Sequence, residues 1–212
     1  MNNVAFQTFG IKKGPSSLVT IGTQIWTTTN LDVETYRDGT PIPQVTNQTT
    51  WNSLTTGAWC YYANSTANGI VYGKLYNWYA VAGIDGSGIP RVLAPVGYHT
   101  PTNAEWETLV TYLGGTAIAG GKMKSTGTSL WNSPNLGATN SSGFTGLPGG
   151  TRAFSGSTTF YGIRNYAQFW TSSAGVNPST GSMRYLAWSS ANISSVESVN
   201  VLYGASVRLI KD

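Results

Sequence analysis

Residues 100–115, TPTNAEWETLVTYLGG, contain the start, the buried face and the end of one helix. Thr102 can cap the helix, and Glu105 three residues later can complete a capping box. Four apolar residues then fall at the i, i+3, i+4 and i+7 spacing of a single buried stripe: Trp106, Leu109, Val110 and Leu113. Two glycines, residues 114–115, provide the stop. This segment predicts a helix that packs on a core through one face.

Strands are predicted at the two ends of the chain. The segments LVTIGTQIW (residues 18–26) and ASVRLIKD (residues 205–212) are rich in β-branched and apolar residues, which favours a strand in each. If these strands pair, the two ends of the domain meet. A second helix is predicted over residues 72–81, YGKLYNWYAV, although the aromatic residues there would also suit a strand.

After Gly115 the chain is divided into short pieces by Gly, Asn, Pro and Ser. Residues 139–156, TNSSGFTGLPGGTRAFSG, are typical of turns throughout. No helix is predicted between Gly115 and Asp212, and no internal repeat is found. The sequence therefore predicts an α+β fold with paired terminal strands, two helices and a loop-rich C-terminal half.

The composition limits the class of protein. The 212 residues are 40% hydrophobic, so one domain with a short extension can bury a core. Charged residues make up 9%, against about 25% in ordinary soluble domains. The net charge is +4, but the basic residues are scattered apart from the pair Lys12–Lys13. This pattern argues against nucleic-acid binding, which usually needs a basic face.

The start of the chain and its apolar runs bear on localisation. Residues 1–17, MNNVAFQTFGIKKGPSS, lack the basic and apolar regions of a secretory signal. No apolar run is long enough to span a membrane. We therefore expect a protein without a membrane span that does not use this export route.

Few residues suggest catalysis. The single histidine, His99, precedes the capped helix, and a role in fixing the start of that helix by hydrogen bonding is favoured over a general base or a metal ligand. The single cysteine, Cys60, lies among aromatic residues and is expected to be buried and inert. Glu105 and Glu107 lie on the helix, where capping already explains Glu105. No catalytic residue is predicted.

Metal and cofactor sites have equally little support. Calcium needs a cluster of oxygen ligands, and the only loose group of acidic residues is Asp32, Glu34 and Asp38. The glycine-containing pieces lack the strand–turn–helix context of a phosphate loop. We expect no metal site and no cofactor.

The segment 153–207 has an unusual composition. Its only charged residues are Arg164, Arg184 and Glu197, and nine aromatic residues are separated mainly by Ser, Asn, Gly, Thr and Val. Tyr and Trp give a large rigid contact area while Ser, Gly and Asn adapt, which is the mixture used by antibody paratopes. The segment predicts a binding surface, with core strands as the alternative interpretation.

Seven short motifs in order carry a resemblance to a known family. They are IGTQIWTTTNLDVETYRDGTPIP, TTGAWCYYAN, YGKLYNWYAV, LAPVGYHTPTNAEWETL, GFTGLPGGTR, FWTSS and YGASVRLIKD. Together they resemble the Fibrobacter succinogenes major paralogous domain, which is related to formylglycine-generating enzymes, over residues 21–212. The resemblance implies a C-type lectin-like fold in which a loop-rich section presents the binding face. Residues 1–20 are then a leader or an attachment segment.

The resemblance extends to the variable proteins of diversity-generating retroelements. In those proteins the variable region lies near the C-terminus and is followed by a fixed strand, which implies that residues 153–207 are the variable ligand-binding region here. The resemblance implies framework roles for Trp26, Trp78, Trp106, Trp170 and Val207, and a structural role at the start of the helix for His99, Thr102 and Glu105. From composition and position, the predicted ligand-facing residues are Tyr161, Arg164, Asn165, Tyr166, Tyr185, Trp188, Ser190, Asn192, Ser194, Val196, Asn200, Leu202 and Tyr203.

The sequence differs from related proteins at two functional motifs, and each difference argues against one possible function. Formylglycine-generating enzymes carry functional cysteines toward the C-terminus, and this chain has none there. Residues 131–135, WNSPN, only partly match the motifs of calcium-dependent lectins. These departures argue against oxidase activity of the formylglycine-generating type and against calcium-mediated sugar binding.

The expected function is that of a phage tail receptor-binding protein on the virion surface. The expected partner is a protein or glycan on a host or partner cell, with virion attachment through residues 1–20 and a homotrimer as the expected assembly. The alternatives are a bacterial cell-surface adhesin and a structural surface module, and a formylglycine-generating type of enzyme is less favoured.

Overall fold

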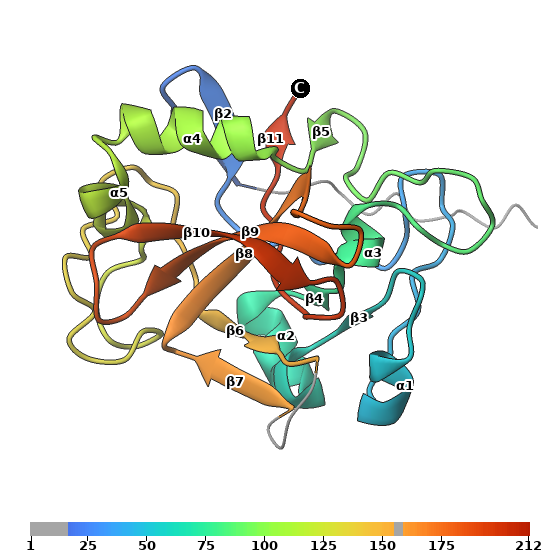
Figure 1. The fold of residues 1–212 in the computed structure, drawn as a ribbon. Helices are drawn as coiled ribbons and strands as arrows, with labels where there is room; N and C mark the ends of the chain where they lie inside the picture. The colour runs from blue at the N-terminus through green and yellow to red at the C-terminus, as the bar shows by residue number, and fades with distance from the viewer. Residues whose placement is uncertain (1–16, 155–158) are drawn as a thin grey trace, which may run out of the picture.

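The computed structural model describes residues 17–154 and 159–212. These residues form a mixed α/β fold in which helices surround several small antiparallel sheets (Figure 1). The helices are α1 Gln48–Asn52, α2 Thr66–Tyr72, α3 Trp78–Val81, α4 Asn103–Tyr112 and α5 Thr116–Met123, with a 3₁₀ turn at Tyr62–Asn64. The strands are β1 Leu18–Ile21, β2 Gln24–Thr27, β3 Trp59–Cys60, β4 Leu75–Tyr76, β5 Tyr98–His99, β6 Gly149–Arg152, β7 Phe160–Ile163, β8 Tyr166–Ala174, β9 Thr180–Ala187, β10 Ile193–Asn200 and β11 Ile210–Lys211.

The two ends of the domain meet in one sheet, of strand order β1-β2-β11-β5. Trp26 on β2 pairs with Ile210 on β11, which confirms that the terminal segments pair. The first segment is a hairpin and not the single strand that was predicted. Gly22 adopts a φ of 62° at the turn, a conformation that glycine takes without strain, so β1 folds back on β2.

Helix α4 confirms the prediction from residues 100–115. Thr102 and Glu105 form the reciprocal capping box, and Gly114 and Gly115 follow the helix with positive φ angles. The four residues of the apolar stripe are all buried: Trp106, Leu109, Val110 and Leu113.

The helix predicted over residues 72–81 is wrong as a single element. Helix α2 ends at Tyr72 because Gly73 has a φ of 71°, and residues 75–76 form β4. Asn77 then caps the four-residue helix α3 by accepting a hydrogen bond from the Ala80 N–H. Local capping and a short strand pairing divide the segment into three pieces.

The prediction that no helix follows Gly115 is also wrong, because α5 begins at Thr116. Two glycines in this helix lower its helix propensity, but they allow close backbone approach. A Cβ atom on Gly120 would lie 2.1 Å from the carbonyl oxygen of Asn192, and one on Gly121 would lie 2.3 Å from that of Gly137. Tertiary packing therefore requires glycine at positions 120 and 121, and these glycines are the reason that the sequence did not predict a helix.

The central sheet is the meander β8-β9-β10, with strand order β10-β9-β8. Helices α4 and α5 lie against one side of this sheet, and the β6–β7 hairpin lies on the other (Figure 1). Residues 204–206 join the sheets by bridges from Gly204 to Arg152, from Ala205 to Tyr76 and from Ser206 to Phe169.

An aromatic cluster fills the core between the terminal sheet, α4 and the central sheet. The cluster contains Trp26, Trp106, Phe144 and Phe169, and five ring pairs among them have centroids 4.8–5.8 Å apart. All four side chains are fully buried. The cluster confirms the framework role of Trp26 and Trp106.

Buried cations hold loops through main-chain carbonyl groups, and we call Lys124, Arg152 and Arg208 the carbonyl clamps. Arg208 donates to the carbonyl oxygens of residues 27, 144 and 145 and to Asn30 Oδ1. Lys124 Nζ donates to the carbonyl oxygens of residues 136, 187 and 190, and Arg152 to those of residues 45 and 46. Burial lowers the pKa of Lys124 to about 8 and that of Arg208 to about 9, so both remain charged at neutral pH.

Candidate functional site

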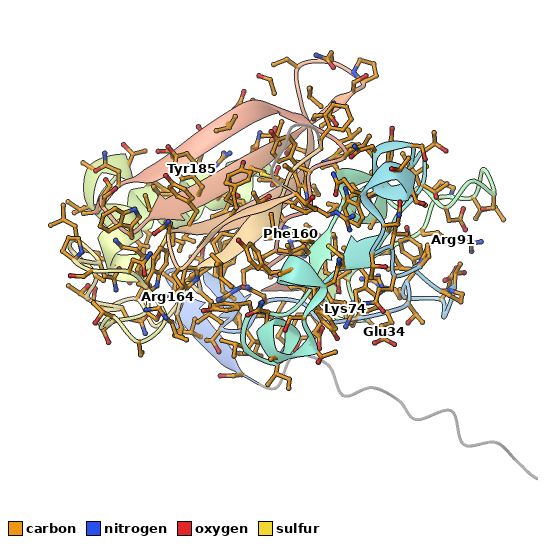
Figure 2. The ribbon with its side chains drawn as sticks, turned by 90° about the horizontal axis from the view of Figure 1, so that it is seen from below. Glu34, Lys74, Arg91, Phe160, Arg164 and Tyr185 are labelled. Carbon is orange, nitrogen blue, oxygen red and sulfur yellow. The ribbon has the colours of Figure 1, made fainter. Side chains whose placement is uncertain are left out.

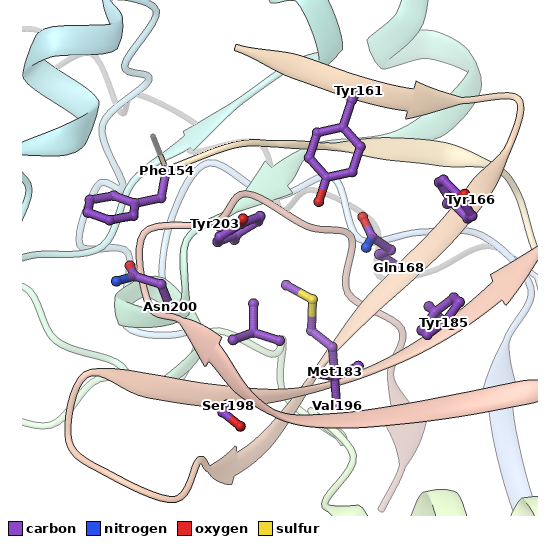
Figure 3. Close-up of a pocket in the computed structure, with 11 residues that line it drawn as sticks. Phe154, Tyr161, Tyr166, Gln168, Met183, Tyr185, Val196, Ser198, Asn200 and Tyr203 are labelled. Carbon is purple, nitrogen blue, oxygen red and sulfur yellow. The ribbon is translucent and has the colours of Figure 1, made fainter. Parts of the chain in front are cut away.

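A cavity of about 710 Å³ opens beside the central sheet, on the face away from α4 and α5 (Figure 3). We call it the tyrosine pocket because four of its eleven lining residues are tyrosines. The lining residues are Phe154, Tyr161, Tyr166, Gln168, Met183, Tyr185, Val196, Ser198, Val199, Asn200 and Tyr203.

The floor of the tyrosine pocket is one face of the central sheet. Side chains of a strand point alternately to the two faces, so Tyr166 and Gln168 face the pocket while Ala167 and Phe169 are buried on the core side. The register places Gln168 opposite Tyr185, and Val196 of β10 opposite Met183. Three strands thus supply neighbouring side chains to a single surface.

The facing wall comes from two other parts of the chain. Tyr161 extends from β7, and its ring points into the pocket toward Gln168 (Figure 3). Tyr203 follows β10 in a turn where Asn200 Oδ1 accepts a hydrogen bond from the Leu202 N–H. This turn is attached to the core because Trp51 Nε1 donates to the Leu202 carbonyl oxygen at 2.6 Å.

The tyrosine pocket is electrically neutral, since none of its lining residues carries a charge. Burial, with a smaller contribution from Tyr203, raises the pKa of Tyr161, so its hydroxyl remains protonated in the physiological range. The Tyr166 and Tyr185 rings meet edge to face with centroids 6.3 Å apart. The surface can bury apolar area and offer hydroxyl and amide groups for hydrogen bonding.

Six of the thirteen predicted ligand-facing residues line the tyrosine pocket: Tyr161, Tyr166, Tyr185, Val196, Asn200 and Tyr203. Arg164 lies outside it, in the turn between β7 and β8, with a φ of 66°. Its guanidinium donates to Asn132 Oδ1 and to the carbonyl oxygens of residues 128 and 129. In this structure Arg164 therefore holds a loop.

The remaining six predicted residues also lie away from the pocket lining. Trp188 is partly buried against the hydrophobic core that includes Leu109 and Leu186, and Leu202 is 8% exposed. Asn165 accepts a hydrogen bond from Asn132 Nδ2, and the Ser190 hydroxyl accepts one from the Asn192 N–H. Ser194 is opposite Tyr185, so it is on the sheet face that forms the pocket floor, but it is not among the lining residues.

Five lining residues were missed by the sequence analysis: Phe154, Gln168, Met183, Ser198 and Val199. A signal for two of them was present. Gln168 lies two residues after Tyr166, and Met183 two residues before Tyr185, which is the spacing of one strand face. Fixing the alternation of β8 from the buried Phe169 would have found Gln168, and the two-residue spacing from Tyr185 on β9 would have found Met183.

The acidic residues considered for calcium are engaged by cations. Lys74 Nζ lies 2.5 Å from Asp32 Oδ1 and 3.5 Å from Glu34 Oε1, and Figure 2 shows Lys74 and Glu34 near each other. Asp38 pairs with Arg91. Within residues 17–154 and 159–212, no group of three or more His, Cys, Asp or Glu side chains is arranged to hold a metal ion.

His99 connects the C-terminus to the start of α4. Its Nε2 lies 2.7 Å from Glu105 Oε1, and its Nδ1 lies 2.6 Å from Asp212 Oδ1. Glu105 Oε2 also accepts from the Thr102 N–H. The expected hydrogen-bonding role at the start of the helix is confirmed, and the structure adds two acidic partners that sequence spacing did not indicate.

This arrangement predicts a pH dependence of stability. Burial lowers the pKa of His99, but hydrogen bonds to Asp212 and Glu105 outweigh it, and the net shift is upward from 6.5. A raised pKa in the folded state gives stability that is complete below pH 6.5 and is lost as pH rises through the folded value. Because the His99 side chain is 38% exposed, we expect less than about 1 kcal/mol.

Urea unfolding of the wild-type chain and a His99→Gln variant between about pH 5 and pH 9 checks this prediction. The difference in unfolding free energy should shrink as pH rises. A difference that stays constant with pH would contradict the role of the charged imidazole.

Cys60 is fully buried, and burial raises the pKa of its thiol to about 11. The thiolate is the reactive form, so we expect the native protein to resist a thiol reagent such as dithionitrobenzoate. The unfolded chain should react with one equivalent, because it has one cysteine. Rapid reaction of the native protein would support the alternative of a cysteine-dependent enzyme.

The geometry defines a mixed α/β domain with a neutral, tyrosine-lined pocket on the open side of its central sheet. A family model described as the Fibrobacter succinogenes major domain matches residues 19–211, and the chain belongs to this family. No curated protein and no solved structure matches the chain. Among the described residues, no helix combines the length and apolarity needed to cross a bilayer.

Proposed function

We propose that this protein is a non-enzymatic recognition domain that binds a ligand in the tyrosine pocket. One observation carries the proposal: all the residues that line the pocket belong to the charge-poor segment 153–207. The same segment forms the central sheet. One face of this sheet packs on the core, and the other face forms the floor of the pocket.

The physical basis of binding is burial of apolar area by aromatic side chains, with polar groups setting orientation. Ligand pockets are usually concave, mostly apolar and furnished with a few polar groups. The tyrosine pocket has this composition, with Gln168, Ser198 and Asn200 beside the rings. Tyrosine is also among the residues enriched at binding hot spots.

The finer parts of the proposal rest on the resemblance. We propose a C-type lectin-like arrangement, a variable region of the diversity-generating kind over residues 153–207, and a place on a phage tail that binds a host-cell surface ligand. A homotrimer would strengthen weak single-site binding through avidity. The proposed attachment segment, residues 1–20, lies outside the described residues except for Ser17–Thr20, of which Leu18–Thr20 belong to β1.

Amplicon sequencing of the gene in its source population tests the variable region. Under the proposal, substitutions concentrate within residues 153–207 at the tyrosine-pocket positions and spare buried neighbours such as Phe169 and Leu186. Substitutions spread evenly along the chain would remove diversification and leave a fixed binding domain.

Binding of the fluorescently labelled protein to cells of the source community tests recognition itself. The proposal expects saturable binding that unlabelled protein displaces. No saturable binding to any fraction of the community would refute recognition of a surface ligand.

A further inference from the structure

We propose that the tyrosine pocket takes a neutral pyranose ring of a glycan, and that Gln168 is its specificity-determining hydrogen-bond acceptor. The inference deepens the proposed function and rests on it. Three observations carry it: the absence of charge in the pocket, the fit of its rings and volume to a sugar, and a buried amide oxygen without a partner.

The first observation is the absence of charged side chains among the eleven lining residues. The charged residues of the surrounding strands point elsewhere: Arg184 is buried on the core side with Glu107, and Glu197 is absent from the lining. An acidic sugar or a charged peptide group would lose its hydration without gaining a counter-ion. The pocket therefore favours a neutral ligand.

The second observation is the match between the rings and a sugar. The faces of aromatic rings are electron-rich, and the C–H bonds on one face of a pyranose carry partial positive charge. Tyr166 and Tyr185 present neighbouring rings on the sheet, and Tyr161 and Tyr203 lie on the facing wall (Figure 3). Rings on two sides can enclose a flat hydroxylated ring and leave its edge to polar groups.

The size of the pocket separates a glycan from a single inserted side chain. Its volume of about 710 Å³ is in the range of small-molecule sites, roughly 300–1,000 Å³. One aromatic side chain of a partner protein would fill only part of that space. A sugar with its neighbouring units occupies it more completely.

The third observation is the Gln168 side chain at the floor of the pocket. Its amide lies against the Tyr161 hydroxyl, yet its Oε1 atom is buried without a hydrogen-bond partner among the described residues. A buried acceptor without a hydrogen-bond partner is unfavourable, because it has lost its hydration without gaining a donor. The terminal torsion of a glutamine side chain is soft, so a half-turn that exchanges the amide oxygen and nitrogen lets Gln168 pair with the Tyr161 hydroxyl or, when a ligand is bound, with a ligand hydroxyl.

An array of neutral oligosaccharides provides the first test. The probes are oligomers of glucose, galactose, mannose, xylose and N-acetylglucosamine, with oligogalacturonate and sialylated oligosaccharides as acidic comparisons. We expect the full chain to bind at least one neutral probe and neither acidic probe. Calorimetric titration of that probe should show binding at least tenfold weaker for Gln168→Leu and at least thirtyfold weaker for Tyr185→Ala.

Two variants control for indirect effects. Tyr185→Phe keeps the ring and should retain most of the affinity if stacking is the main contribution. Tyr112→Ala removes an exposed tyrosine on α4, outside the pocket, and should change nothing. Equal loss for Gln168→Leu and Tyr112→Ala would overturn the assignment of Gln168.

Treatment of the cells separates failure of this inference from failure of the proposed function. Periodate destroys vicinal diols of sugars, and proteinase K removes surface proteins. Binding lost with periodate and kept after proteinase K supports a glycan. Binding lost only with proteinase K, or binding of the acidic probes alone, overturns the neutral-sugar inference and leaves recognition intact. Binding to neither cells nor array refutes recognition itself.

Discussion

Replacing Arg208 with methionine should lower the free energy of unfolding by about 4 kcal/mol, the largest loss we expect from a single change outside the pocket. The guanidinium is fully buried over Phe144, at 4.6 Å from the ring centroid, and donates to four oxygens. Methionine fills similar space but leaves the oxygens of residues 27, 144 and 145 without a donor. Urea unfolding followed by tryptophan fluorescence measures the loss.

Arg37→Ala is the matched control. Arg37 also donates to three carbonyl oxygens, those of residues 94, 95 and 98, but its side chain is exposed to solvent. Water can replace its hydrogen bonds, so we expect a loss below about 1 kcal/mol. Arg208→Lys keeps the charge without the fork of donors and should fall between the two. If Arg208→Met costs no more than Arg37→Ala, the clamp does not stabilise the fold.

Truncating Tyr185 to alanine should weaken ligand binding at least thirtyfold, which corresponds to about 2 kcal/mol, the usual threshold of a hot spot. The ring lies on the middle strand of the sheet and contacts Tyr166. Because it is half-buried and faces the pocket, its removal should cost only about 1 kcal/mol of stability. Binding of the labelled variant to cells, alongside its urea unfolding curve, separates the two effects.

Trp188→Ala is the comparison for Tyr185→Ala, because composition and position predicted both residues to face the ligand. Trp188 packs against the core cluster, so its loss should lower stability by about 2–3 kcal/mol and leave binding intact. Tyr112→Ala should affect neither property. If Trp188→Ala abolishes binding while the variant remains folded and Tyr185→Ala does not, the binding face lies at the β9–β10 turn and not at the tyrosine pocket.

The parts of the fold that could be predicted are those set by local chemistry. The capping box, the apolar stripe and the two glycines fully specified α4. Helix α5 could not be predicted because its two glycines lower the helix propensity of the segment. They are there because the backbones of residues 137 and 192 pack closely against them, and this tertiary contact cannot be inferred from local sequence. Residues 72–81 were misjudged because α3 is only four residues long and depends on the cap at Asn77.

The site could be located by composition but not resolved into residues. The mixture of rings and small polar residues marked the segment that lines the candidate pocket. Composition did not separate Arg164, which holds a loop, from Tyr185, because the difference lies in hydrogen bonds to residues 128, 129 and 132. Strand phase distinguishes the two faces, and it depends on knowing that Phe169 is buried.

The carbonyl clamps have a consequence for how such a protein changes over generations. A carbonyl oxygen is the same on every amino acid, so Lys124 holds residues 136, 187 and 190 by groups that mutation of those residues does not remove. The backbone path of the turn after β9 is therefore fixed by one lysine distant in the sequence and not by the side chains of the turn itself. The amino acids of the turn can therefore be substituted during evolution while the path of the backbone is preserved.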